Sequence, residues 1–167
     1  MNTVHWHLLL NHLPIIGGII GMGILVAGFV LKNNPIVKRT ALGVFVFSAV
    51  FAIPAFLTGE GAEEAVENLP GVMESLIEEH EDLGKLFLLL VSTLGVVSLL
   101  ALFADIKKLK AAKTLYFLVL LVGMVSIYFG ATTGVSGGKV RHTEIRTDAQ
   151  NVSKGEVFDS LESEEED

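Results

Sequence analysis

The chain has no cysteine among its 167 residues, and only 19% of its residues are charged. The absence of thiols excludes disulfides, thiolate metal ligands and a cysteine nucleophile. Soluble domains usually carry about a quarter charged residues, so the charge content is low for that class. The charges also form blocks rather than a basic stripe, which argues against a nucleic-acid-binding protein.

Four long apolar segments make up much of the chain. A membrane-spanning helix needs about 17 to 25 mostly apolar residues, and residues 13–31, 41–57, 86–103 and 115–134 qualify. Each is apolar on all sides, and so short a chain has no polar shell to bury them in a soluble core. The sequence therefore predicts an all-α fold, a four-helix transmembrane bundle, in which Pro54 kinks the second helix. The first segment lacks a preceding Lys or Arg and a small-residue cleavage site, so we expect it to be retained.

The loops between these segments differ in the sign of their charge. Residues 58–82 contain nine acidic residues and no Lys or Arg, whereas the first and third loops carry Lys32, Lys38, Arg39, Lys107, Lys108, Lys110 and Lys113. Lys and Arg in short loops mark the cytoplasmic side of a membrane. We therefore expect a multi-pass protein of a bacterial inner membrane, with both termini and the acidic loop on the periplasmic side.

The sequence divides into a membrane domain and a tail. Residues 1–146 form the predicted four-span domain, and residues 147–167 are polar and end in an acidic run. The tail has too little apolar surface to offset the entropy of ordering it, so we expect it to be disordered. Within the acidic loop, Val72, Met73, Leu76 and Ile77 follow the helical spacing i, i+1, i+4, i+5, which predicts an outer amphipathic segment on the membrane surface or on the bundle.

The five histidines, His5, His7, His12, His80 and His142, all fall at or near the predicted outer face. Glu60 follows the second span on the same face. Each of the four spans therefore has a potential ligand at one end of the bundle. Ligands on facing helices are how bundles build cofactor and metal sites. Histidines near a membrane surface are also often merely solvated, and for His5 we favour that interpretation.

Glycines accompany several of these residues. Gly84 lies one helical turn after His80, where the absence of a side chain admits a second helix or a flat cofactor. Gly137 and Gly138 would allow the chain to turn sharply and carry His142 back over the bundle. In the first span, the glycines Gly17, Gly21 and Gly28 share a face and favour close packing of helices.

The opening of the chain carries a family resemblance. The segment 7–15, H-L-L-L-N-H-L-P-I, resembles the H-P-x-x-x-H-x-P-I opening of a four-helix bacterial membrane family defined as a domain of unknown function. Leu8 stands where that family usually has proline. The resemblance covers roughly residues 5–145 and maps the family's positions onto His7, His12, Glu60, His80 and His142. The family's helices and histidines are similar to those of two-haem b-type membrane cytochromes, which implies a redox role by analogy.

Three functions are consistent with this pattern, and whether the chain is an enzyme stays open. The first is haem b binding for electron transfer, with His12 and His80 as the best ligand pair and His142 or His7 serving a second site or a propionate. The second is a transition-metal ion, zinc, iron or copper, held by His12, Glu60, His80 and His142. The third is a cofactor-free structural or assembly subunit. Candidate partners are the lipid bilayer, other membrane redox subunits and a second copy of the chain.

Overall fold

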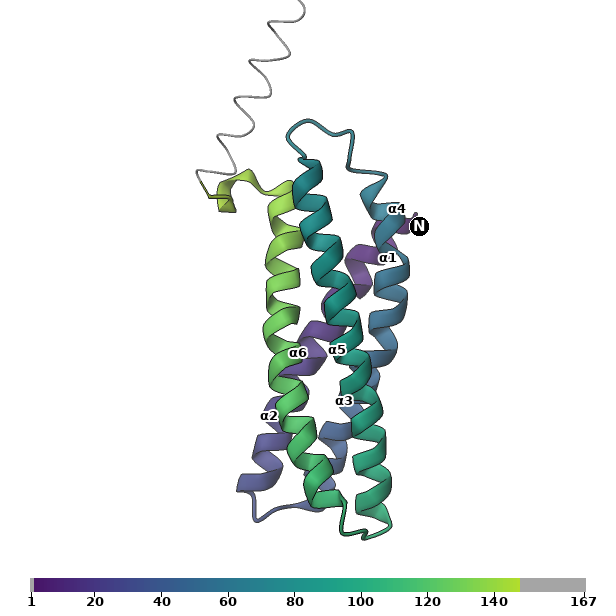
Figure 1. The fold of residues 1–167 in the computed structure, drawn as a ribbon, viewed down its shortest axis with the longest axis vertical. Coiled ribbons are helices and arrows are strands. Elements are labelled where there is room, and N and C mark those ends of the chain that lie inside the picture. The colour runs from purple at the N-terminus through teal and green to yellow at the C-terminus, as the bar shows by residue number, and fades with distance from the viewer. Residues whose placement is uncertain (1, 148–167) are drawn as a thin grey trace, which may run out of the picture.

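The computed structural model describes residues 2–147, and these form helices without any strand. Four long helices lie side by side along the molecule: α2 (His12–Val30), α3 (Pro35–Leu57), α5 (Glu74–Ile106) and α6 (Ala112–Arg141) (Figure 1). The shorter elements are α1 (Thr3–Leu10), α4 (Gly59–Glu63) and the 3-10 helix η1 (Thr143–Ile145). The predicted all-α four-helix bundle is confirmed.

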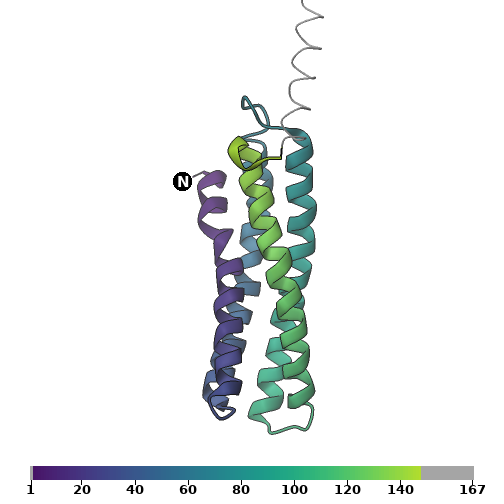
Figure 2. The ribbon, with the colours of Figure 1, turned by 90° about the vertical axis from the view of Figure 1, so that its left-hand side faces the viewer.

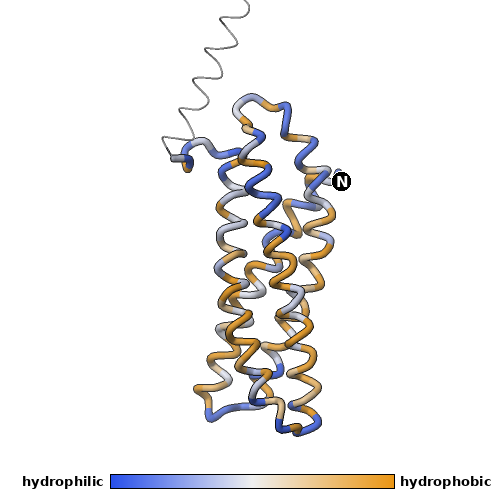
Figure 3. Tube along the Cα trace, in the orientation of Figure 1, coloured by the Kyte–Doolittle hydropathy of each residue, from blue (hydrophilic) through white to orange (hydrophobic). Residues whose placement is uncertain are grey.

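Each of the four helical segments is long and apolar enough to cross a membrane, with α1 and α2 counted together as one 28-residue segment. The hydropathy follows the same pattern, because apolar residues fill the middle of the bundle and polar residues gather at its two ends (Figure 3). Large apolar side chains such as Val30, Leu89 and Phe117 are exposed along the helices. Exposed apolar surface of this extent indicates contact with lipid, and the chain is a multi-pass membrane protein.

The first span consists of two helices that meet at Asn11. This residue is the C-cap of α1 and the N-cap of α2. Pro14 has no N–H to donate to the carbonyl of Leu10, so the helical hydrogen bonds are interrupted at this point. Figure 2 shows that α1 nevertheless continues the general direction of α2. The break fixes where His7 and His12 lie relative to each other.

Three helices are longer than the apolar segments that predicted them, and the first of these, α3, begins six residues early, at Pro35. Helix α5 begins at Glu74, twelve residues before the predicted start, and α6 continues to Arg141. The sharp turn expected at Gly137 and Gly138 is therefore wrong, since both lie inside α6 and the amide of His142 donates to the carbonyl of Gly138 at 2.9 Å. A glycine inside a helix costs only about 1 kcal/mol, which packing can offset.

The glycine face of α2 packs against α3, as the sequence predicted. Gly17, Gly21 and Gly28 are all buried. A Cβ atom added to Gly21 would lie 2.8 Å from Phe45 Cε1, which is closer than real Cβ contacts. The core at this level consists of fully buried side chains: Leu25, Leu42, Phe45, Leu94 and Val119.

The amphipathic segment packs on the bundle. Leu76 and Ile77 lie in the first turn of α5, and both are buried in one cluster with Val140 near the end of α6. The sequence predicted that this segment lies either on the membrane surface or on the bundle, and in the structure it lies on the bundle. The tail that was expected to be disordered, residues 147–167, lies outside the described residues except for Thr147.

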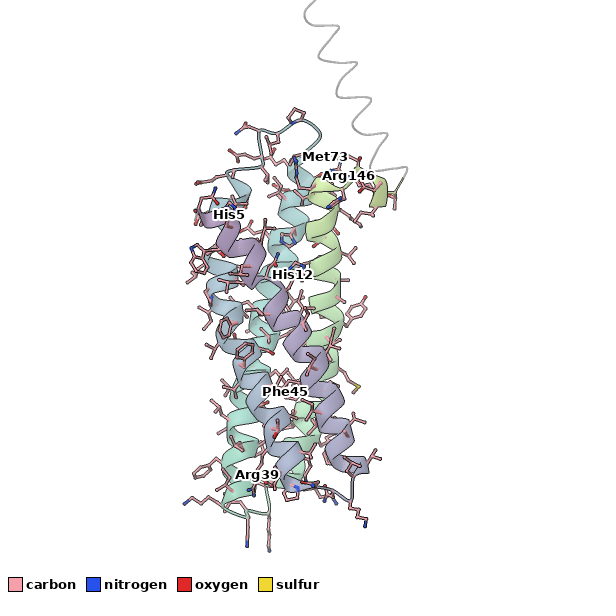
Figure 4. The ribbon with its side chains drawn as sticks, turned by 180° about the vertical axis from the view of Figure 1, so that it is seen from behind. His5, His12, Arg39, Phe45, Met73 and Arg146 are labelled. Carbon is pink, nitrogen blue, oxygen red and sulfur yellow. The ribbon has the colours of Figure 1, made fainter. Side chains whose placement is uncertain are left out.

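The bundle has two chemically different ends, which Figure 4 separates clearly. Arg39 lies at one end, and His5, Met73 and Arg146 lie at the other. We name the first the basic end, defined by Arg39, Asp105 and the six lysines Lys32, Lys38, Lys107, Lys108, Lys110 and Lys113. We name the second the histidine end, defined by the five histidines and the acidic residues of positions 60–82.

Candidate functional site

Two histidines meet at the histidine end of the bundle. His7 lies on α1 and His80 on α5. Their ring centroids are 6.5 Å apart, and the two ring planes are nearly perpendicular at 89°. Both side chains are partly buried. Helix α1 packs on α2, α3 and α4, whereas the start of α5 packs on α6. The pair therefore joins two parts of the bundle.

The ring of His7 is oriented by a backbone carbonyl. Its Nδ1 lies 2.9 Å from the carbonyl oxygen of Ala55, near the C-terminal end of α3. A carbonyl oxygen only accepts hydrogen bonds, so Nδ1 must carry the proton. In the neutral ring, Nε2 then has a free lone pair. Gly59 of α4 also lies beside this ring, where an added Cβ would make an ordinary contact with His7 Cε1 at 3.7 Å.

The ring of His80 is held in the same way by α6. Its Nδ1 lies 3.1 Å from the carbonyl oxygen of Thr133 and 3.0 Å from the hydroxyl of Ser136. The Ser136 hydroxyl itself donates to the Thr133 carbonyl at 2.9 Å. A proton on Nδ1 satisfies both neighbours, because the hydroxyl oxygen can still accept. Nε2 is again the nitrogen left with a lone pair.

Gly137 makes room for the imidazole of His80. A Cβ added to this glycine would lie 2.8 Å from His80 Cε1 and 3.2 Å from Nδ1. No side chain fits there unless the ring moves. The glycines near position 137 thus serve to seat His80 against α6, instead of turning the chain after the fourth span.

This arrangement suits the coordination of one metal centre by two imidazoles. Histidine ligands commonly donate their second ring N–H to a backbone carbonyl, which fixes the tautomer and the ring orientation. Two imidazoles on opposite sides of one metal, with metal–nitrogen bonds of about 2.0 Å, would have centroids roughly 6 Å apart. The observed separation of the ring centroids, 6.5 Å, is close to that value, so the spacing of the two rings is compatible with such a centre.

The other predicted ligands do not join the pair. His12 is exposed, and its Nδ1 contacts the Asn11 side chain. His142 is exposed and pairs with Glu144 at 2.9 Å. Glu60 is also exposed. Within residues 2–147, no group of three or more His, Asp or Glu side chains is placed to hold a metal ion. The predicted four-ligand set of His12, Glu60, His80 and His142 is therefore not assembled in this structure.

The sequence favoured His12 as the partner of His80, and the structure brings His7 into ring contact with His80. Five residues separate His7 from His12, which corresponds to about one and a half helical turns. His7 lies in α1 before the break at Asn11, and His12 opens α2. Of the two, His7 is in ring contact with His80 of α5, whereas His12 is exposed and contacts Asn11. His5 contacts Asn2 at 2.6 Å and is exposed, as expected for a solvated residue.

Sequence analysis did not single out Ser136 or Thr133. Residues 134–138 read G-V-S-G-G, a G-x-S-x-G pattern that could have drawn attention to Ser136. In hydrolases such a serine lies on a sharp strand-to-helix turn, whereas Ser136 is buried inside α6. Its hydroxyl is engaged by Thr133 and His80, so its evident role is to position the imidazole.

The acidic residues at this end repel one another. Partial burial, followed by the carboxylates of Glu81, Glu67 and Glu60, raises the pKa of Glu63. Glu63, Glu67 and Glu74 also line an open cavity of about 320 Å³. In contrast, a hydrogen bond from its own backbone N–H, together with the side chain of His142, lowers the pKa of Glu144. Negative charge is thus concentrated at the histidine end, and within residues 2–147 no ion pair joins these carboxylates to His7 or His80.

The chain was compared with protein-family models, curated proteins and solved structures, and none of the three comparisons gave a match.

Proposed function

We propose that this protein binds haem b through His7 and His80 and transfers electrons at the histidine end of the bundle. The observation that carries the proposal is the pair itself. Each Nδ1 is committed to a backbone carbonyl, and the ring centroids are 6.5 Å apart. Each ring therefore has one nitrogen, Nε2, that could bind the iron of a haem.

The number of ligands favours haem over a bare metal ion. The macrocycle of a haem supplies four nitrogens, so the protein would need to add only one or two ligands. Zinc sites in proteins use three or four protein ligands, and the described residues offer no third ligand beside the pair. Haem would supply reversible one-electron chemistry here.

The chain's own residues would set the orientation of the ligands. The carbonyls of Ala55 and Thr133 hold the two rings, and the Ser136 hydroxyl supports the second ring. Hydrogen bonds of this kind raise the basicity of a ligating imidazole. The charge of the loops supports a location of this end on the periplasmic side of a bacterial inner membrane. A redox partner would then approach from that side.

An absorption spectrum of the purified protein, oxidised and reduced, tests the proposal. After expression with ample haem, we expect a Soret band that His7→Ala and His80→Ala each abolish. His12→Ala and His142→Ala are matched controls, because both histidines are exposed and have only local side-chain partners. These two variants should keep the band. A wild-type protein without any Soret band would falsify the haem proposal.

A substitution that keeps an axial ligand sharpens the test. His80→Met would retain the haem with a thioether ligand, and His/Met ligation raises the reduction potential relative to two histidines. We expect a higher midpoint potential in a redox titration of this variant.

Elemental analysis of the same samples separates the alternatives. Stoichiometric zinc or copper without haem would indicate the bare-ion site, and neither metal nor haem would indicate a structural subunit.

A further inference from the structure

Lys38 is a buried cation at the basic end of the bundle. It lies in the first turns of α3, and only 6% of its surface is exposed. Its side-chain stem packs on Gly28 of α2, where an added Cβ would lie 2.7 Å from Lys38 Cγ and 3.0 Å from its backbone nitrogen. The glycine therefore creates the space that the lysine occupies.

Two aromatic rings flank the ammonium group. Lys38 Nζ lies 4.5 Å from the ring centroid of Tyr116 on α6 and 5.3 Å from that of Phe29 on α2. The two rings contact each other edge to face, with centroids 5.8 Å apart. The ammonium is thus held between α2, α3 and α6 by cation–π attraction. We name this arrangement the Lys38 site.

The charge of Lys38 is not neutralised by a carboxylate. The acid at this end, Asp105, binds the neighbouring Arg39, with 2.6 Å between Arg39 Nε and Asp105 Oδ2. Lys38 itself forms no ion pair with any residue between positions 2 and 147. Cation–π contacts are weaker than the penalty for burying an unpaired ion. An anion at the Lys38 site would therefore stabilise the fold.

The hydroxyl of Tyr116 provides a second, independent observation. Only 4% of this residue is exposed, and its hydroxyl is buried without a hydrogen-bond partner. Buried polar groups in proteins nearly always have a partner. A free hydroxyl donor on the same residue whose ring holds the Lys38 ammonium is what an anionic oxygen ligand would use.

We propose that the Lys38 site binds the phosphate of an anionic phospholipid, through the ammonium of Lys38 and the hydroxyl of Tyr116. The basic end carries seven Lys and Arg side chains and one acid, Asp105, so its charge is complementary to an anionic head group. Val30, Ile36 and Phe117 are exposed apolar residues of the same three helices, and they lie one or two residues along the chain from Phe29, Lys38 and Tyr116. They offer a surface for acyl chains, which favours a lipid over free phosphate. The haem proposal has no part in this inference.

Thermal unfolding in a neutral detergent tests the lipid site. We expect phosphatidylglycerol to raise the midpoint temperature, and native mass spectrometry to detect one retained lipid per chain. Phosphatidylcholine and inorganic phosphate serve as separate additions. Neither should reproduce the shift, because the first has a neutral head group and the second has no acyl chains. An equal shift with inorganic phosphate would overturn the proposal in favour of a free-anion site.

Variants locate the site on the protein. Lys38→Met keeps an apolar stem of similar length and should raise the dissociation constant for phosphatidylglycerol about tenfold or more, as expected for a lost hydrogen bond to a charged group. Lys110→Met is the matched control, since Lys110 is an exposed lysine of the same end, and its affinity should stay close to that of the wild type. Equal affinities of the wild type, Lys38→Met and Lys110→Met for phosphatidylglycerol would overturn the proposal.

Tyr116→Phe guards against misfolding of the lysine variant. It removes only the hydroxyl and retains the ring that contacts Lys38 and Phe29. We expect it to fold and to bind phosphatidylglycerol several-fold more weakly than the wild type, since one neutral donor contributes less than a charged one. Unchanged lipid affinity in Tyr116→Phe would exclude the hydroxyl as a ligand and overturn the proposed site.

Discussion

The two ends of the bundle use the same packing device for opposite chemistry. At the histidine end, Gly137 of α6 leaves space for the imidazole of His80. At the basic end, Gly28 of α2 leaves space for the stem of Lys38. In both cases a glycine inside an apolar helix admits a polar side chain from the next helix. The two ends differ in the groups that interact with the polar side chain.

Backbone carbonyls accept hydrogen bonds from His7 and His80, whereas side chains are the partners of Arg39 and Lys38 at the basic end. Ala55 and Thr133 accept from His7 and His80, and these acceptors are fixed by the helices themselves. At the other end, Arg39 relies on the carboxylate of Asp105, and Lys38 relies on two aromatic rings. The histidine end is therefore sensitive to packing, and the basic end is sensitive to charge and ionic strength.

Removing His80 should produce the largest effect on stability. His80→Ala deletes the contacts of Nδ1 with Thr133 and Ser136 and leaves a cavity beside Gly137, so we expect a loss of about 2 kcal/mol in the free energy of unfolding. His12→Ala should change it by less than about 0.5 kcal/mol, since His12 is exposed. Unfolding in mixed micelles measures both. Equal losses would contradict the distinction between a packed and a solvated histidine.

The packing of His80 can also be tested from the opposite helix. In Gly137→Ala the new methyl group would collide with the imidazole, and we expect a loss of about 1 to 2 kcal/mol. Gly134→Ala, also in α6, meets only Ile15 Cδ1 at an ordinary 3.6 Å. It should be neutral or stabilising by up to about 1 kcal/mol, because alanine favours the helix. If Gly137→Ala were equally well tolerated, the close contact with His80 would be refuted.

The ion pair of the basic end should have a smaller effect that depends on salt. Asp105→Asn removes the partner of Arg39, whose side chain is 38% exposed, so a loss of about 0.5 to 1 kcal/mol is expected. Salt at 1 M should shrink the difference between wild type and variant, because it screens exposed charges. His80→Ala measured in parallel should show no such dependence. A salt-independent Asp105→Asn loss would argue against the electrostatic description of this end.

The smallest effect is expected from the acidic loop. Because the pKa of Glu63 is raised in the folded protein, its charged form is disfavoured there. The folded protein therefore loses stability as the pH rises above 4.5, the pKa of Glu63 in the unfolded chain. The loss is complete above the higher pKa of Glu63 in the folded protein. Glu63→Gln should therefore be more stable than wild type at neutral pH, and the difference should vanish below pH 4.5. Midpoint temperatures measured across this range check the sign. A larger difference at acidic pH would be the opposite of the expected result.

The fold was predictable because hydrophobic length alone determines how many helices cross a membrane. The helix ends were less predictable. The first turns of α5 and the last turns of α6 are polar, so they fall outside any apolar segment, although Leu76, Ile77 and Val140 pack them together. Only the small periodic pattern around Leu76 indicated that this part of the loop contacts the bundle.

The histidine pair was only partly predictable. The clustering of histidines at one end followed from the sequence, but the choice of His7 over His12 depends on the helix break at Asn11 and on the rotation of α1. The groups that hold the rings are backbone carbonyls of Ala55 and Thr133. Because every residue has a carbonyl, such acceptors leave no mark in the sequence. Gly137 can be recognised in the sequence, but it was interpreted as part of a turn after the fourth span.

The paired use of glycines has an evolutionary consequence. If position 80 became a small residue, the constraint on position 137 would disappear, and a side chain could be accepted there at no steric cost. The same reasoning couples positions 28 and 38. In relatives of this chain, each glycine should therefore vary together with its partner on the neighbouring helix, and a histidine or lysine retained without its glycine should be rare.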